Sequence, residues 1–161
     1  SQFSRKHFVE DLAGTLARHG IDGQRIVIEI TESLIMDNIQ GHLKTLKTLR
    51  SLGIELSVDD FGTGYSSLAY LKRLPLHELK IDRSFLTTIN TDDDSAAIVT
   101  AIVSMGHQLG LKIVAEGVET RQQLEFLRAH HCDTCQGFLF SPAVPPEQFA
   151  QQLTAGIAMA R

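Results

Sequence analysis

Cysteine is scarce in this sequence: two cysteines stand among 161 residues, and tryptophan is absent. One cysteine pair does not suffice for a secreted disulfide scaffold or a four-cysteine zinc site. Cys132 and Cys135 do form a C-x-x-C pair beside His130 and His131, a pattern shared by zinc and redox sites. The histidines lack the looped spacing of a zinc finger, and the pair precedes a predicted strand rather than a helix. We therefore predict two reduced, space-filling thiols of a cytoplasmic protein.

A basic excess and long apolar runs are also missing. The formal net charge of −4 at pH 7 disfavours a nucleic-acid polymer or an anionic membrane as a partner. No apolar run approaches the roughly 20 residues that cross a bilayer, and the opening SQFSRKHF contains no apolar signal core. We expect a cytoplasmic domain without membrane contact of its own, although a longer protein containing it could be anchored. The missing initiator Met suggests that such a longer sequence exists.

What the sequence does contain is a regular alternation of strand and helix patterns. Short β-branched runs predict strands, and apolar residues at helical spacing separate them. Such alternation favours an α/β fold in which helices cover a parallel sheet. The strands are predicted at residues 25–30, 54–58, 78–81, 111–115 and 137–140, and the helices at residues 3–20, 38–53, 66–74, 94–110, 120–131 and 145–160.

Capping residues mark several of these predicted helix starts. Ser4 is expected to cap the first helix, and Thr120 with Gln123 has the spacing of a capping box. The run TDDDS at 91–95 has the composition of a calcium loop, but no downstream Gly and Glu complete an EF-hand. We predict a solvated turn there, with Asp94 or Ser95 as the cap of the following helix.

Acidic residues stand at the ends of four successive predicted strands. Because the carboxyl ends of parallel strands meet at one rim, these side chains should converge there. The residues are Glu29 and Glu32, Asp59 and Asp60, Asp82 with Lys80 just before it, and Glu116 and Glu119, while Gln136 opens the last predicted strand. A single acid at a strand end is also commonly a surface residue or a helix cap. The adjacent pair Asp59 and Asp60 favours a site, because it is bracketed by apolar residues.

Several carboxylates in one small site repel one another unless cations or protons compensate them. The candidates are hard oxygen ligands, which favour Mg²⁺ or Mn²⁺ over zinc. Asp59 and Asp60 could serve two ions, an arrangement suited to displacement at phosphorus. Lys80 could stabilise a phosphate oxygen or orient the attacking water. The residues alone therefore indicate a metal-dependent phosphohydrolase and leave its substrate open.

Five longer motifs extend this interpretation. EITES, DDFGTGYSSL, LKIDRSF, IVAEGVET and QGFLFS together resemble, in order and spacing, the EAL-domain cyclic di-GMP phosphodiesterases of bacteria. The resemblance covers roughly residues 3–150 and implies a TIM-like (β/α)8 barrel. It also implies hydrolysis of cyclic di-GMP to the linear dinucleotide pGpG, with two Mg²⁺ or Mn²⁺ ions as cofactors.

The same resemblance implies metal-binding and catalytic roles for the matching positions. Glu29 would bind the first metal, Asp59 would bridge both metals, and Asp60 would bind the second. Lys80 would contact the attacking water or the phosphate. Glu116 would be a ligand of the second metal or the general base for that water.

Four further positions would support the substrate, the metals or a loop. Glu32 would anchor the loop DDFGTGYSSL, a control element of the family that is linked to dimerisation. Glu119 and Gln136 would belong to the metal and substrate network, and Asp82 accompanies Lys80 in its motif.

Two departures from the family pattern qualify this resemblance. The Glu-Ala-Leu motif is absent, and so is an Asn of the preceding strand motif, both of which supply ligands of the first metal. About five of eight barrel strands are present, so residues 1–161 are expected to form the C-terminal portion of a single EAL-type domain. This part alone should hydrolyse cyclic di-GMP weakly or not at all, and should form homodimers, aggregate or depend on a missing N-terminal segment. The alternative function is a non-catalytic cyclic di-GMP receptor or signalling module.

Overall fold

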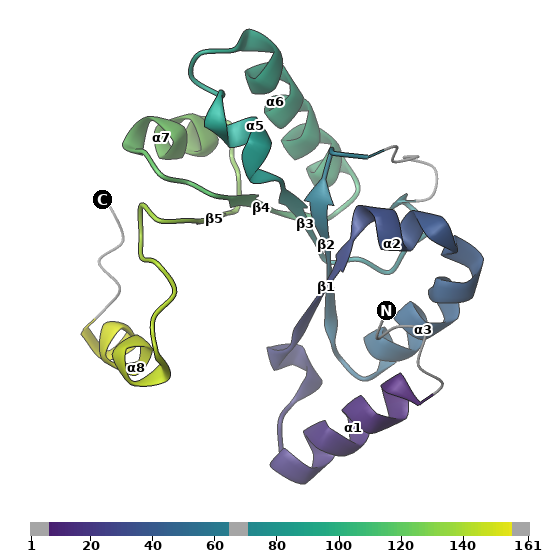
Figure 1. The fold of residues 1–161 in the computed structure, drawn as a ribbon. Helices are drawn as coiled ribbons and strands as arrows, with labels where there is room; N and C mark the ends of the chain where they lie inside the picture. Colours follow the sequence, from purple (N-terminus) through teal and green to yellow (C-terminus); the bar gives the residue numbers. More distant parts are fainter. Residues whose placement is uncertain (1–6, 65–70, 156–161) are drawn as a thin grey trace.

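The computed structural model describes residues 7–64 and 71–155. Its centre is a sheet of five parallel strands that lie side by side in chain order (Figure 1). The strands are β1 (Val27–Thr31), β2 (Glu55–Phe61), β3 (Glu78–Ile81), β4 (Lys112–Glu116) and β5 (Thr134–Gln136). The predicted α/β fold with five parallel strands is therefore confirmed, and β1 and β5 are the edge strands of this sheet.

Helices connect these strands and pack on the sheet. α3 contacts β2, and α6 contacts β3 and β4, whereas α8 lies apart from the other helices (Figure 1). The helices are α1 (Phe8–His19), the 3-10 turn η2 (Gly23–Arg25), α2 (Glu32–Asp37), α3 (Ile39–Ser51), α5 (Arg83–Thr87), α6 (Asp93–Gln108), α7 (Arg121–Ala129) and α8 (Pro146–Ala155).

The two faces of the sheet differ in chemistry because strand side chains alternate. One face is apolar: Leu56, Leu79 and Ile113 are fully buried and belong to the hydrophobic core. Their neighbours along the strands, among them Asp59 and Lys80, lie on the opposite face. Packing of helices against the apolar face thus leaves a polar face free to carry a site.

Most of the predicted elements are confirmed. β3 occupies the predicted residues, and the capping box of α7 forms as expected between Thr120 and Gln123. α1 is followed by Gly20 in the left-handed conformation with φ 61°, a geometry that suits glycine. The short helices α2 and α5 were not predicted, because six or five residues are too few to show a helical period.

Two predicted caps are wrong. α1 begins at Phe8 after His7, so Ser4, which lies outside the described residues, is not its cap. α6 is capped by Asp92, whose carboxylate accepts hydrogen bonds from the backbone of Asp94 and Ser95. The prediction of a turn and cap in this acidic run is correct, but the capping residue lies two positions earlier than Asp94.

The last strand also differs from the prediction. β5 covers Thr134–Gln136, and the apolar run at 137–140 forms a turn instead. The backbone N–H of Val118 bonds to the Gln136 carbonyl, and the N–H of Leu139 bonds to the Val118 carbonyl. Gln136 therefore ends the strand rather than opening it, which places its side chain at the carboxyl rim.

Three remaining predictions concern other parts of the chain. The predicted helix at 66–74 lies mostly outside the described residues. Cys132 and Cys135 are free and half-buried, in keeping with the prediction of reduced thiols. Within the described ranges, no helix has both the length and the apolar character needed to cross a membrane.

Candidate metal and phosphodiester site

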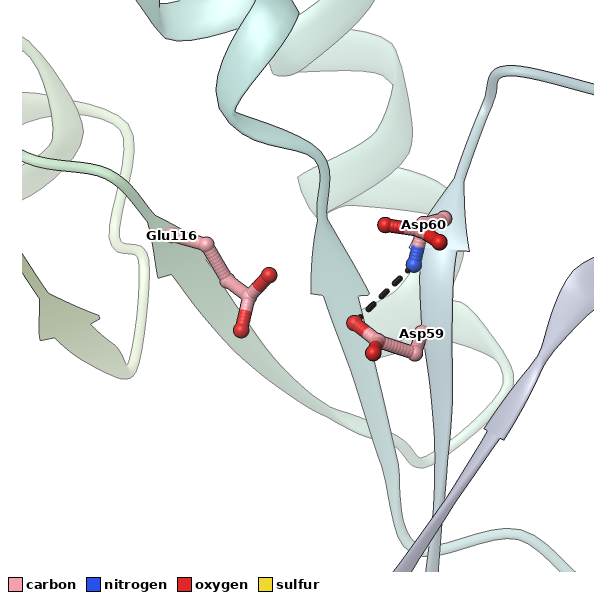
Figure 2. A group of neighbouring side chains, drawn as sticks. All are labelled: Asp59, Asp60 and Glu116. Carbon is pink, nitrogen blue, oxygen red and sulfur yellow. Dashed lines mark hydrogen bonds between the residues drawn. The ribbon is translucent and has the colours of Figure 1, made fainter.

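Three carboxylates converge at the carboxyl rim of the sheet. Asp59 and Asp60 come from β2 and Glu116 from the end of β4, and one oxygen of each lies within 4.8 Å of the others (Figure 2). In the part of the chain that the structure describes, this is the one group of three or more potential metal-ligating side chains, and it contains no His or Cys. A donor set made only of carboxylates fits a hard divalent cation such as Mg²⁺ or Mn²⁺.

A local irregularity of β2 lets two consecutive aspartates serve the same site. Consecutive side chains of a regular strand point to opposite faces. The register between β2 and β3 shifts between Val58 and Phe61, and Asp60 has a left-handed φ of 55°. Its backbone N–H donates to Oδ1 of Asp59 at 3.0 Å. The bulge therefore turns Asp60 toward the side of Asp59, and Asp is among the residues that tolerate this backbone conformation.

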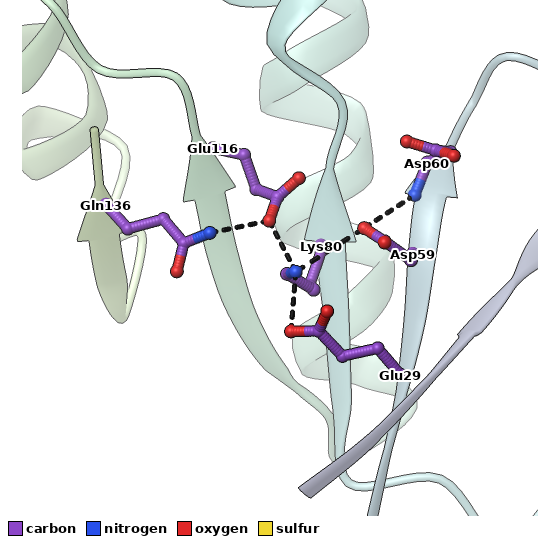
Figure 3. Close-up of polar contacts among 6 residues, drawn as sticks. All are labelled: Glu29, Asp59, Asp60, Lys80, Glu116 and Gln136. Carbon is purple, nitrogen blue, oxygen red and sulfur yellow. Dashed lines mark hydrogen bonds and ion pairs between the residues drawn. The ribbon is translucent and has the colours of Figure 1, made fainter. Parts of the chain in front are cut away.

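Lys80 on β3 is the positive group that compensates the acids. Its side chain is 4% exposed, and its ammonium lies 2.6 Å from Oε1 of Glu29 and 3.5 Å from Oδ1 of Asp59. It also pairs with Oε1 of Glu116 (Figure 3). Burial favours the neutral amine, but the hydrogen bonds to Glu116 and Glu29 outweigh it and raise the pKa of Lys80. Lys80 thus remains a cation at the centre of three carboxylates.

Gln136 fixes the orientation of Glu116. Its Nε2 donates to Oε1 of Glu116 at 2.6 Å, the same oxygen that Lys80 binds (Figure 3). Oε2 of Glu116 makes no hydrogen bond with another described side chain and can serve a cation or a proton. Burial raises the pKa of Glu116 and outweighs the opposing hydrogen bond from Lys80. Desolvation and the adjacent Asp59 charge likewise raise the pKa of Asp60.

Glu32 supports the loop that follows β2. It is 3% exposed at the start of α2, and its Oε2 accepts the backbone N–H of Gly62 at 3.0 Å. Gly62 has a φ of 97°, and a Cβ on Gly64 would lie 2.8 Å from Oε1 of Glu32. The described start of the loop thus wraps closely around this carboxylate, as a loop anchor requires. Residues 65–68 of the loop lie outside the described part.

Besides Glu32, three predicted acids lie outside the group of three carboxylates. Glu29 is 52% exposed and reaches the site through its contact with Lys80. Asp82 caps α5 by accepting the backbone N–H of Ser84 at 3.0 Å. The Glu119 side chain is exposed, and its backbone N–H donates to Oε1 of Gln123. The supporting roles predicted for Asp82 and Glu119 therefore stay predictions.

The sequence analysis missed a cation at the same rim. Arg83 opens α5 directly after β3, and its stem lies against Gly117, where an added Cβ would come within 2.6 Å of Cβ of Arg83. The sequence contained a signal for Arg83, because it stands next to Asp82, which was predicted as a site residue from its position after a strand.

Comparison with known proteins agrees with this geometry. The EAL domain family model matches residues 1–143. MucR from Pseudomonas aeruginosa, described as a bifunctional diguanylate cyclase/cyclic di-GMP phosphodiesterase, is 48% identical over 157 residues, which are 98% of this chain and 22% of MucR. The chain thus spans about a fifth of the length of this curated relative.

Solved structures give the same result. The Pseudomonas MucR phosphodiesterase in complex with c-di-GMP has a TM-score of 0.89 at 49% identity, over 92% of this chain and 60% of that one. A manganese/cy-diGMP complex of Klebsiella pneumoniae BlrP1 has a TM-score of 0.81 at 34% identity, over 87% of this chain and 36% of that one. With the five-stranded fold and the carboxylates at its rim, these likenesses show that the chain belongs to the EAL domain family.

Proposed function

We propose that the chain forms the part of an EAL phosphodiesterase domain that binds a pair of Mg²⁺ or Mn²⁺ ions and cleaves cyclic di-GMP to pGpG. The convergence of Asp59, Asp60 and Glu116 around Lys80 carries this proposal. The relatives named for cyclic di-GMP cleavage, and the manganese and calcium complexes among the structural neighbours, support the choice of substrate and ion.

In this proposal, the carboxylates hold the two ions. Glu29 and Asp59 would hold the first ion, Asp59 and Asp60 would hold the second, and Glu116 would be a further ligand of the second ion or the general base. The bound ions would supply charge neutralisation at the phosphate and a more acidic water. Gln136 keeps Glu116 in place, Glu119 belongs to the outer substrate network, and Glu32 and Asp82 hold the loop and the start of α5.

Lys80 would contact the attacking water or the phosphate, and Glu116 is the candidate for the residue that accepts the water proton. Hydrolysis forms a bond between the water oxygen and phosphorus and breaks the bond from phosphorus to the 3′ oxygen, which leaves a 5′ phosphate on pGpG. Lys80 would turn one ammonium N–H from its 3.5 Å contact with Asp59 to the attacking water or the phosphate. As the alternative to holding the second ion, Glu116 can accept the water proton at Oε2, because its Oε1 is taken by Lys80 and Gln136. The departing 3′ oxygen takes up a proton from solvent water.

The test is product formation by the full-length natural protein. Incubation with cyclic di-GMP and Mn²⁺, followed by chromatography, should yield pGpG. Glu116→Gln should lower the rate by at least about 100-fold, whereas Glu125→Gln, on the exposed side of α7, should leave it unchanged. Absence of pGpG would contradict the proposal, and tight binding of intact cyclic di-GMP without turnover would favour the receptor function.

A further inference from the structure

The stem of Arg83 lies beside Gly117, the residue that follows Glu116. Arg83 is the first residue of α5, directly after β3, and its side chain is exposed. Gly117 follows the site residue Glu116, and the position of a Cβ on Gly117 would lie 2.6 Å from Cβ and 3.8 Å from Cδ of Arg83. The Arg83 stem therefore runs over the end of β4, between the two strands that supply Lys80 and Glu116.

The charge of Arg83 is available for a ligand. Within residues 7–64 and 71–155, its guanidinium makes no hydrogen bond or ion pair. Its field nevertheless reaches the site, because it opposes the upward shift in the pKa of Asp60 and contributes to the lowered pKa of Asp82. The charge of Lys80 is less available to a ligand, since its ammonium is buried and already paired with three carboxylates. Lys112 lies at the opposite end of β4.

The substrate assigned under the proposed function presents two anions. A cyclic dinucleotide contains two phosphodiesters, each with one negative charge, and only one of them can be attacked at the carboxylate group. The other must lie near the same acidic rim, where it is repelled unless a cation meets it. Guanidinium suits this task because its planar N–H groups can bind two phosphate oxygens together.

Resting on that proposed function, we propose that Arg83 binds the phosphodiester of cyclic di-GMP that is not cleaved. It is a substrate-binding residue that favours a ligand with two phosphates over a ligand with one. Because the guanidinium has no hydrogen-bond or ion-pair partner among the described residues, its removal should change ligand affinity without unfolding the protein.

Calorimetric titration of the full-length protein tests this. In the presence of Ca²⁺, cyclic di-GMP and GMP are each titrated into the unaltered protein, Arg83→Ala and Arg83→Lys, with chromatography to verify that the ligand stays intact. Arg83→Ala should weaken cyclic di-GMP binding by about 10- to 100-fold and leave GMP binding unchanged. Arg83→Lys should recover part of the loss. Arg25→Ala, which removes an exposed arginine from η2, is the matched control for net charge.

Two results would overturn the role of Arg83 alone: unchanged cyclic di-GMP affinity in Arg83→Ala, or an equal loss for both ligands. Formation of pGpG by the unaltered protein, measured separately with Mn²⁺, reports on the proposed function and distinguishes its failure from that of Arg83. In that assay Arg83→Ala should raise KM and leave kcat nearly unchanged.

Discussion

At the scale of single residues, the site is organised by one buried cation. Two adjacent aspartates at a strand end require compensation, and Lys80 supplies it through contacts with Glu29, Asp59 and Glu116. The ammonium has three N–H groups and meets three carboxylates, so the acids are held in place before any metal binds. We regard Lys80 as the residue that allows the acidic rim to fold.

Replacement of Lys80 by Met should therefore destabilise the metal-free protein. The variant keeps the packing of the stem but leaves three carboxylates facing one another. Since two of these carboxylates are half-buried and Glu29 is exposed, the free energy of unfolding should fall by about 2–3 kcal/mol. Mn²⁺ should restore part of the loss by neutralising the same acids.

Urea denaturation with and without Mn²⁺ measures this change. Lys44→Met, on the exposed side of α3, is the matched control and should unfold like the unaltered protein. Equal unfolding free energies for Lys80→Met and Lys44→Met would contradict the organising role of Lys80.

At the scale of elements, the alternation of strands and helices was predictable, and the details of strand ends were not. Short apolar runs with turn residues between them are a local signal, and they located β3 and the start of α7 correctly. The bulge of β2 at Asp60 and the early end of β5 at Gln136 depend on bonds between distant backbone groups. No residue pattern within 137–140 reveals that the backbone N–H of Leu139 bonds to the carbonyl of Val118.

One contact between elements gives a pH prediction away from the site. Nδ1 of His77, just before β3, lies 2.7 Å from Nη1 of Arg50 on α3 and accepts the Leu56 N–H of β2 at 3.2 Å. Burial, with the nearby Arg50 charge, lowers the pKa of His77 below its ordinary value of 6.5. The neutral ring is therefore the form that joins these three elements.

Stability should depend on this ring below neutral pH. The unfolded state gains a proton near pH 6.5 while the folded state resists it, so the His77 contribution is present above that pH. It is lost progressively as the pH falls toward the lowered folded pKa. Denaturation at pH 7.5 and 5.5 should show a larger loss for the unaltered protein than for His77→Gln, which keeps an acceptor but does not titrate. Identical pH dependence of the two proteins would refute this.

At the scale of the whole molecule, the sheet has two edge strands and exposed apolar side chains. Val27 on β1 is 47% exposed, and Phe138 beyond β5 is 71% exposed. Phe149 and Leu153 on α8 are also exposed, one helical turn apart. Strand edges that no described residue pairs with, and apolar surface, favour association with further polypeptide.

The polypeptide of residues 1–161 should therefore self-associate when studied alone. Analytical ultracentrifugation should show a sedimentation coefficient that rises with concentration. Phe149→Ser with Leu153→Ser should reduce this rise, because it removes an apolar stripe from α8, whereas Gln148→Ser should not. A monomer at every concentration would show that the exposed edges and side chains do not drive association.

The convergence of strand-end carboxylates at one rim was predictable from the sequence, and this prediction rested on topology more than on any single residue. Parallel strands in chain order carry their ends to one side, so Asp59 and Glu116 had to approach each other. Which acids join the group of three carboxylates was not predictable, because Asp82 and Glu119 follow strands equally well but turn to a helix cap and to solvent. Those differences arise from backbone geometry after each strand.

The most direct test is Mn²⁺ binding by this polypeptide, followed by electron paramagnetic resonance. Since Asp59 lies in the carboxylate group and contacts Lys80, Asp59→Asn should weaken binding about tenfold or more. Asp93→Asn, which removes the same charge from the exposed first turn of α6, should bind Mn²⁺ like the unaltered chain. Equal Mn²⁺ affinity in all three proteins would show that the strand-end carboxylates do not form a cation site.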